Sequence, residues 1–275
     1  MAPALILCGL ALACFPGDAH AWGLQSHVFF AHYALLFAPL ADRELRAAAR
    51  RLPGMVLAGA CLPDLALAGV ALGTPAFRRA HRWSTLARMA AAPRDEAERA
   101  LALGYGSHLL ADVIAHNLFV PEHEARLLRL RHVTHALAEW AMDDHLAARA
   151  PARPSDVLAL DQGALIAFIA RGFRCGEPLA ARALRLLQRA DGVLRSTPAP
   201  RACRAVVRLF DRRLGPRFDA YVRRTAGALQ SVEAALAGRF VDWESSDPEG
   251  KTGDRGADRR ARQHVARIVQ AQHHA

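Results

Sequence analysis

The spacing of apolar and polar positions along this 275-residue chain predicts a series of helices. Helix-like segments run from Trp22 to about Ala150. The stretch APARPSD, residues 150–156, is typical of a linker, with Ser155 as N-cap of the helix that follows. Further helical patterns cover roughly residues 156–171, 177–195, 201–213 and 217–238. From about Asp242 the chain becomes polar, charged and rich in glycine.

Composition supports an all-helical chain. Hydrophobic residues make up 52% of the sequence, enough for a sizeable core, and alanine, leucine and arginine dominate while valine, isoleucine and threonine are sparse. We therefore expect an all-α fold, a multi-helix bundle. The expected division is a core over residues 22–150, a helical C-terminal part packing on it over 151–240, and a polar, basic, disordered tail over 241–275.

The first 21 residues have the features of a signal peptide. ALILCGLALACF has the length of an apolar h-region, and AHA, ending at Ala21, is an A-x-A cleavage site, although MAP provides no basic n-region. Cleavage between Ala21 and Trp22 would make the protein exported, either periplasmic or extracellular.

A second apolar segment, GMVLAGACLPDLALAGVALG over residues 54–73, is long enough to span a membrane. Pro63 and Asp64 stand at its middle. A proline interrupts a helix and an aspartate is costly in lipid. The expectation is a buried helix–turn–helix that brings Asp64 to an interior site.

Cysteine and charge give weaker indications. Cys61 lies in an apolar stretch and is expected in the core, which leaves Cys175 and Cys203 as the plausible disulfide of an exported protein. No C-x-x-C motif occurs.

The formal charge of +10 is almost entirely arginine, with Lys251 the sole lysine. Such a surface attracts anionic partners, although a general bias toward alanine and arginine would produce the same composition.

Histidines and carboxylates give the strongest signal. His108, Asp112 and His116 are spaced by four, as are His135 and Glu139, so each set lies along one face of a helix. Imidazoles and carboxylates on facing helices are a metal-binding arrangement.

The predicted cleavage would add a further ligand pair. A free amine and the carbonyl of Trp22 form a five-membered chelate ring on a metal, and His27 lies about one helical turn away.

Five motifs together resemble the zinc-dependent phospholipase C family and the related fungal single-strand-specific zinc nucleases. They are WGLQSH, CLPD, RRAHRW, GYGSHLLADVIAHN and THALAEWAMDD, and they cover Trp22 to about Asp144. The resemblance implies three zinc ions in an all-helical domain. Residue by residue, it assigns the first zinc to the Trp22 amine and carbonyl, His27 and Asp112, the second to Asp64, His81, His108 and bridging Asp112, and the third to His116, His135 and Glu139.

The sequence also departs from the family pattern. The gap between Asp112 and His116 is shorter than in the best-known members, while Glu139 is closer to the phospholipases, since the nucleases use aspartate there. Leu65 stands where choline-specific enzymes carry an aromatic residue, which weakens a preference for phosphatidylcholine. Trp83 either stacks on a nucleic-acid base or packs in the core, and we favour the core.

The resemblance implies phosphate-ester hydrolysis by a zinc-activated water, with Asp64 as general base. The first expected substrate is phospholipid, with peripheral membrane contact through the arginine-rich surface, and no protein partner is inferred. One alternative is a zinc-dependent single-strand nuclease or nucleotidase on the same metals. Another is a non-enzymatic zinc-binding envelope protein.

Overall fold

The computed structural model describes residues 23–126 and 131–239, and the side chains of residues 124–133 lie outside the description. Every regular element in these ranges is a helix, so the all-α prediction is confirmed. The helices are α2 (Leu24–Phe37), α3 (Arg43–Arg51), α4 (Pro53–Gly59), η1 (Leu62–Asp64), α5 (Leu65–Ala71), α6 (Trp83–Ala90), α7 (Glu96–Ile114), η2 (Ala115–Phe119), α8 (Val120–Arg126), α9 (Arg131–Leu146), α10 (Pro154–Val157), α11 (Gln162–Phe173), α12 (Glu177–Ser196), α13 (Ala199–Phe210), α14 (Leu214–Leu229) and α15 (Val232–Leu236). The predicted signal peptide, Trp22 and the tail over 241–275 lie outside the described residues.

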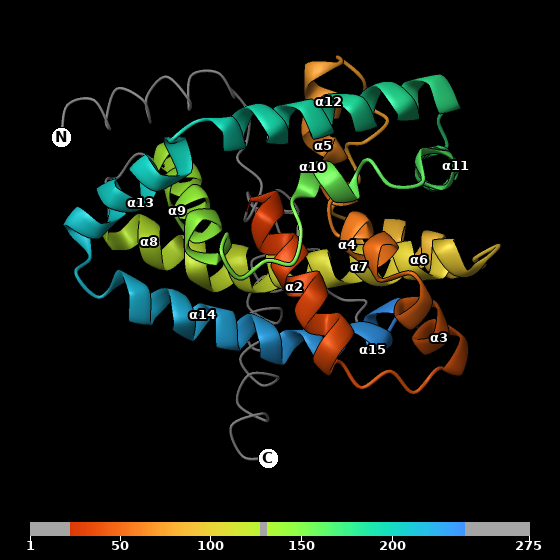
Figure 1. The fold of residues 1–275 in the computed structure, drawn as a ribbon, viewed down its shortest axis with the longest axis horizontal. Helices are drawn as coiled ribbons and strands as arrows, with labels where there is room; N and C mark the ends of the chain where they lie inside the picture. Colours follow the sequence, from red (N-terminus) through yellow and green to blue (C-terminus); the bar gives the residue numbers. More distant parts are fainter. Residues whose placement is uncertain (1–22, 127–130, 240–275) are drawn as a thin grey trace, which may run out of the picture.

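Helix α7 is the central element of the fold. It contacts α2, α3, α4, α6, α14 and α15, and it crosses the middle of the molecule in Figure 1. Its side chains are buried on nearly all sides, which is typical of a helix surrounded by other helices. A polar side chain on α7 therefore points into the protein interior, where it needs a partner.

Two glycines bring α4 unusually close to α7. A Cβ at Gly104 would lie 1.9 Å from the carbonyl oxygen of Val56, and one at Gly59 would lie 2.2 Å from that of Leu101. Any larger residue would push the two helices apart. The close approach places the end of α4, and Asp64 just beyond it, against the middle of α7.

The apolar segment predicted as a buried helix–turn–helix is confirmed as one. Residues Pro53–Ala71 have the length and mean hydropathy of a membrane span, but 78% of the apolar window is buried inside the protein. The segment is divided into α4, the short 3₁₀ helix η1 and α5. Asp64 closes η1 and is only 3% exposed, so the break delivers its carboxylate to the interior.

The C-terminal helices pack against the N-terminal ones. Helix α13 packs on α9, α14 contacts α7 and α2, and α12 contacts α5 and α11. The predicted start of the helix after the linker is wrong. Ser155 lies inside α10, whereas α11 begins at Gln162 because the Asp161 side chain accepts a hydrogen bond from the backbone N–H of Ala164.

The predicted disulfide between Cys175 and Cys203 is also wrong, because both residues and Cys61 are thiols in this structure. Cys175 precedes α12 and Cys203 lies in α13, which follows it. The intervening α12 has 20 residues and is therefore about 30 Å long. A disulfide requires Cα atoms within about 7 Å. Cys61 is fully buried, as expected for a core residue.

Candidate metal centre

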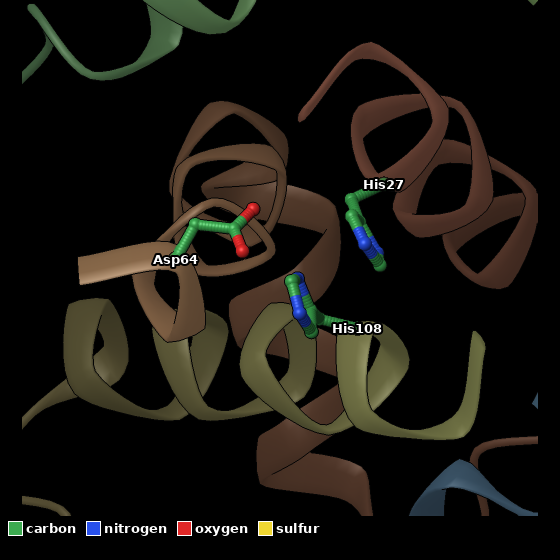
Figure 2. Close-up of side chains that lie close together, drawn as sticks. All are labelled: His27, Asp64 and His108. Carbon is green, nitrogen blue, oxygen red and sulfur yellow. The ribbon is translucent and has the colours of Figure 1, made fainter. Parts of the chain in front are cut away.

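Side chains from four separate segments converge on one buried point of the bundle. His27 comes from α2, Asp64 from the end of η1, His81 from the turn before α6, and His108 and Asp112 from α7. All five are at most 3% exposed. Figure 2 shows three of them, His27, Asp64 and His108, pointing into the same space from their separate helices.

Asp112 lies at the middle of this group. Its Oδ1 is 3.4 Å from Nε2 of His27, while its Oδ2 is 3.1 Å from Nε2 of His108 and 3.5 Å from Nε2 of His81. Nε2 of His81 is in turn 3.6 Å from Oδ1 of Asp64. The two oxygens of one carboxylate thus face two different sets of ligands, which is the arrangement that a bridging carboxylate needs.

Backbone contacts orient the imidazoles. Nδ1 of His108 lies 2.7 Å from the carbonyl oxygen of Ala60. A carbonyl only accepts, so Nδ1 carries the proton and Nε2 presents its lone pair to the centre, as a metal-ligating histidine requires. Tyr105, one turn before His108, donates to the carbonyl of Ala80 and so fixes the turn that carries His81.

Burial shifts the pKa values in this group strongly. It raises the pKa of Asp112 to about 7, against the opposing effect of His27 and His81, and it raises the pKa of Asp64. Burial also lowers the pKa of His81 to about 4, which keeps this imidazole neutral and available as a ligand at neutral pH. Without a cation the protein alone does not stabilise the charged carboxylates, and a bound metal ion would supply the missing charge.

These residues fit zinc. Two groups among the described residues have ligand atoms within 4.8 Å of one another: His27 with Asp64 and His108, and His81 with His108 and Asp112. Neither oxygen of Asp112 accepts a hydrogen bond from a described residue, although both are buried. Nitrogen and carboxylate donors at this spacing suit zinc. The ligand role of each residue stays a prediction.

The remaining predicted ligands form a looser group. His135 and Glu139 are four residues apart on α9, with Nε2 of His135 2.5 Å from Oε1 of Glu139, and the His116 and His135 rings have centroids 5.4 Å apart. Burial raises the pKa of Glu139 to about 7. These three are not among the described groups whose ligand atoms meet the 4.8 Å spacing.

His116 lies in η2, beyond the end of the regular helix α7. His116 was expected to share a regular helix face with His108 and Asp112, but residues Ala115–Phe119 form a π-helix. A π-helix has more residues per turn than an α-helix, and the His116 ring lies beside that of His135 of α9. The regular α-helix that the expectation assumed therefore includes His108 and Asp112 and ends at Ile114, before His116.

Comparison with known proteins gives a family. A family model described as zinc-dependent phospholipase C matches residues 26–172, more than half of the chain. This chain belongs to the zinc-dependent phospholipase C family. No curated protein and no solved structure matches it. The matched range includes every predicted ligand except Trp22 and continues beyond the motifs into α11. At the level of the family this means a zinc-dependent hydrolase acting on phospholipids.

A buried polar network that the sequence did not predict holds the start of α2 in this phospholipase C family member. Asp143 of α9 accepts hydrogen bonds from the backbone N–H and the hydroxyl of Ser26, at 2.9 and 2.6 Å. The backbone of Gly23 passes so close that a Cβ there would lie 2.2 Å from Oδ2 of Asp143. The contact fixes the chain one residue after Trp22, which itself lies outside the described residues.

Arg195 of α12 completes the network. Its Nη2 donates to Oδ2 of Asp143 at 2.7 Å, and its Nε donates to Oδ1 of Asp191 at 2.8 Å. In the sequence, only the two aspartates at the end of THALAEWAMDD indicated this network. They do not indicate which basic residue they pair with. The partner is an arginine more than fifty residues further along the chain, and only the packing of α12 in the folded protein brings it to Asp143.

Replacing Arg195 with alanine should destabilise this phospholipase C family member by about 3–5 kcal/mol, because two buried carboxylates lose their counter-charge. Urea unfolding of wild type and variant measures the difference. Arg201→Ala is the matched control, since that side chain is 86% exposed and 3.8 Å from Asp144, and it should cost under about 1 kcal/mol. Equal losses in both variants would contradict a structural role for the network.

Proposed function

We propose that this chain is an exported, zinc-dependent phosphodiester hydrolase that cleaves phospholipids in the manner of a phospholipase C, releasing diacylglycerol and the phosphorylated headgroup. The observation that carries the proposal is the convergence of His27, Asp64, His81, His108 and Asp112 at one buried point, in a chain of the zinc-dependent phospholipase C family.

The proposed ligand sets follow the family assignment. Trp22, His27 and Asp112 would hold one ion, Asp64, His81, His108 and Asp112 a second, and His116, His135 and Glu139 a third. The distances support a bridging Asp112, since its two oxygens face different histidines. When bound, zinc would supply Lewis acidity that activates water and offsets the charge developing on the phosphate.

Asp64 is the proposed general base. Its carboxylate is buried beside His81, and burial raises its pKa above the usual range of an aspartate. A carboxylate with a raised pKa accepts a proton from the attacking water more readily at neutral pH. The phosphorus–oxygen bond to diacylglycerol breaks as the water oxygen bonds to the phosphorus, and the leaving diacylglycerol oxygen takes up a proton from solvent.

Two side chains close to predicted zinc ligands in the sequence, Leu65 and Trp83, bear on which substrate group the site prefers. Leu65 follows Asp64 directly and is fully buried, so it packs in the core and has no aromatic face for a trimethylammonium group. We therefore propose no preference for choline. Trp83 is 6% exposed and packs in the hydrophobic core, which supports the core interpretation over stacking on a nucleic-acid base.

The test uses zinc-replete protein with a native Trp22 start. Mixed phospholipid vesicles and single-stranded DNA are supplied in parallel, and diacylglycerol, phosphorylated headgroup and nucleotide products are measured. Diacylglycerol with the phosphorylated headgroup is the expected result. DNA cleavage without lipid hydrolysis would establish the nuclease alternative, and a fully metallated protein inert on both would indicate a structural zinc protein.

A further inference from the structure

The chain between two predicted zinc ligands forms a short helix and a returning series of turns, with exposed apolar side chains. Residues 65–80, which we call the α5 hairpin, lead from Asp64 to His81. Leu67 and Val70 are 39% and 67% exposed and three residues apart, so they lie on the same side of α5. The two side chains together form an apolar patch on the exposed side of α5.

The α5 hairpin holds these side chains in fixed positions. Helix α5 ends at Ala71, Gly73 in the following turn has φ +63°, and the N–H of Thr74 donates to the carbonyl of Gly69 at 2.9 Å. Phe77 returns the chain to the core, where a Cβ at Gly69 would lie 3.2 Å from its side chain and where its ring packs edge-on against that of Phe173 at 5.0 Å. The exposed leucine and valine are therefore part of a packed scaffold.

The returning end of the α5 hairpin is cationic. Arg78 and Arg79 are both exposed, and no ion pair joins either one to a described carboxylate. The hairpin contains no aspartate or glutamate at all. Exposed apolar residues combined with uncompensated arginines are the composition of a surface that binds an anionic membrane interface.

Two other exposed apolar sites on the described surface differ in their place relative to the candidate metal centre. Leu209 and Phe210 are 60% and 53% exposed and also stand beside exposed arginines, but they lie at the end of α13, which contains no predicted zinc ligand. Leu36 and Phe37, at the end of α2, precede two acidic residues, Asp42 and Glu44. Neither site is joined at both ends to the candidate metal centre, as the α5 hairpin is.

We propose that the α5 hairpin is the docking surface for an anionic phospholipid bilayer. Leu67 and Val70 enter the headgroup region and Arg78 and Arg79 contact lipid phosphates. The chain segment that touches the bilayer is then joined directly to Asp64 at one end and to His81 at the other, which connects the docking surface to the candidate metal centre. The choice of lipid as occupant rests on the proposed function.

The test measures binding of zinc-replete protein to phosphatidylcholine vesicles with and without phosphatidylglycerol. Arg78→Gln/Arg79→Gln should weaken binding to the anionic vesicles about 30-fold, since each arginine near such a surface contributes on the order of 1 kcal/mol. Leu67→Ser/Val70→Ser should weaken binding to both vesicle types. The matched controls, Arg212→Gln/Arg213→Gln and Leu209→Ser/Phe210→Ser, should bind as wild type.

A second readout separates docking from chemistry. Hydrolysis of a short-chain phospholipid dissolved as monomers should be unchanged in the hairpin variants, while vesicle hydrolysis falls with binding. Wild-type binding by the hairpin variants, loss of binding only in the controls, or loss of DNA affinity with intact vesicle binding would overturn the proposal. Hairpin-dependent vesicle binding by a protein that hydrolyses no phospholipid would instead overturn the proposed function and leave docking standing.

Discussion

Asp112→Asn should abolish hydrolysis and remove more than one zinc ion from each chain. The two oxygens of Asp112 face different partners, His27 at 3.4 Å and His108 at 3.1 Å, so one carboxylate serves two ligand sets. Asparagine keeps the size of the side chain but loses its charge and one donor oxygen. We expect a fall in kcat on the order of a thousandfold or more.

Metal analysis and headgroup release measured on the same sample test this expectation. The His116, His135 and Glu139 group does not include Asp112, so its ion should persist in the variant. Asp191→Asn is the matched control, because Asp191 is a buried aspartate with a raised pKa that contacts Arg195 rather than the centre. Full zinc content in Asp112→Asn protein would show that Asp112 does not bridge two ions.

Adding one residue before Trp22 should also depress activity by orders of magnitude. The proposed Trp22 ligands are a free amine and its own carbonyl, and an amide nitrogen has no lone pair available for a metal at neutral pH. The neighbouring backbone is fixed, since Gly23 lies against Asp143 and Ser26 donates to it. An extended chain cannot recover the chelate by sliding.

Three forms compared at equal zinc make this test: the native Trp22 start, the same protein with one added residue, and Trp22→Phe. Phenylalanine retains the amine and the carbonyl, so substantial activity should remain, and only the extended form should lose an ion. If the extended form is as active and as zinc-loaded as the native start, the N-terminal ligand is wrong.

Local spacing predicted the parts of the site that lie on one helix or at one break. His108 and Asp112 share a face of α7 because four residues complete about one turn, and Pro63 marks the break that turns Asp64 inward. The close packing of α4 on α7, which buries the centre, depends on Gly59 and Gly104. Their role can be recognised only from the contact between the two helices.

Other features depend on tertiary structure that no local pattern specifies. Residues 115–119 have an ordinary helical pattern, yet they form a π-helix, and the His116 ring within it lies beside that of His135. The direction of α12 separates Cys175 from Cys203 and brings Arg195 to Asp143. Pairings over fifty or more residues of chain are set by helix packing, which spacing does not encode.

The most direct measurement is elemental analysis of the native-start protein together with diacylglycerol release before chelation, after chelation and after zinc is restored. A multinuclear zinc phospholipase should contain about three zinc ions per chain, lose hydrolysis when they are removed, and recover it when they return. One ion or none in zinc-replete protein, or hydrolysis that persists after chelation, would contradict the proposed centre.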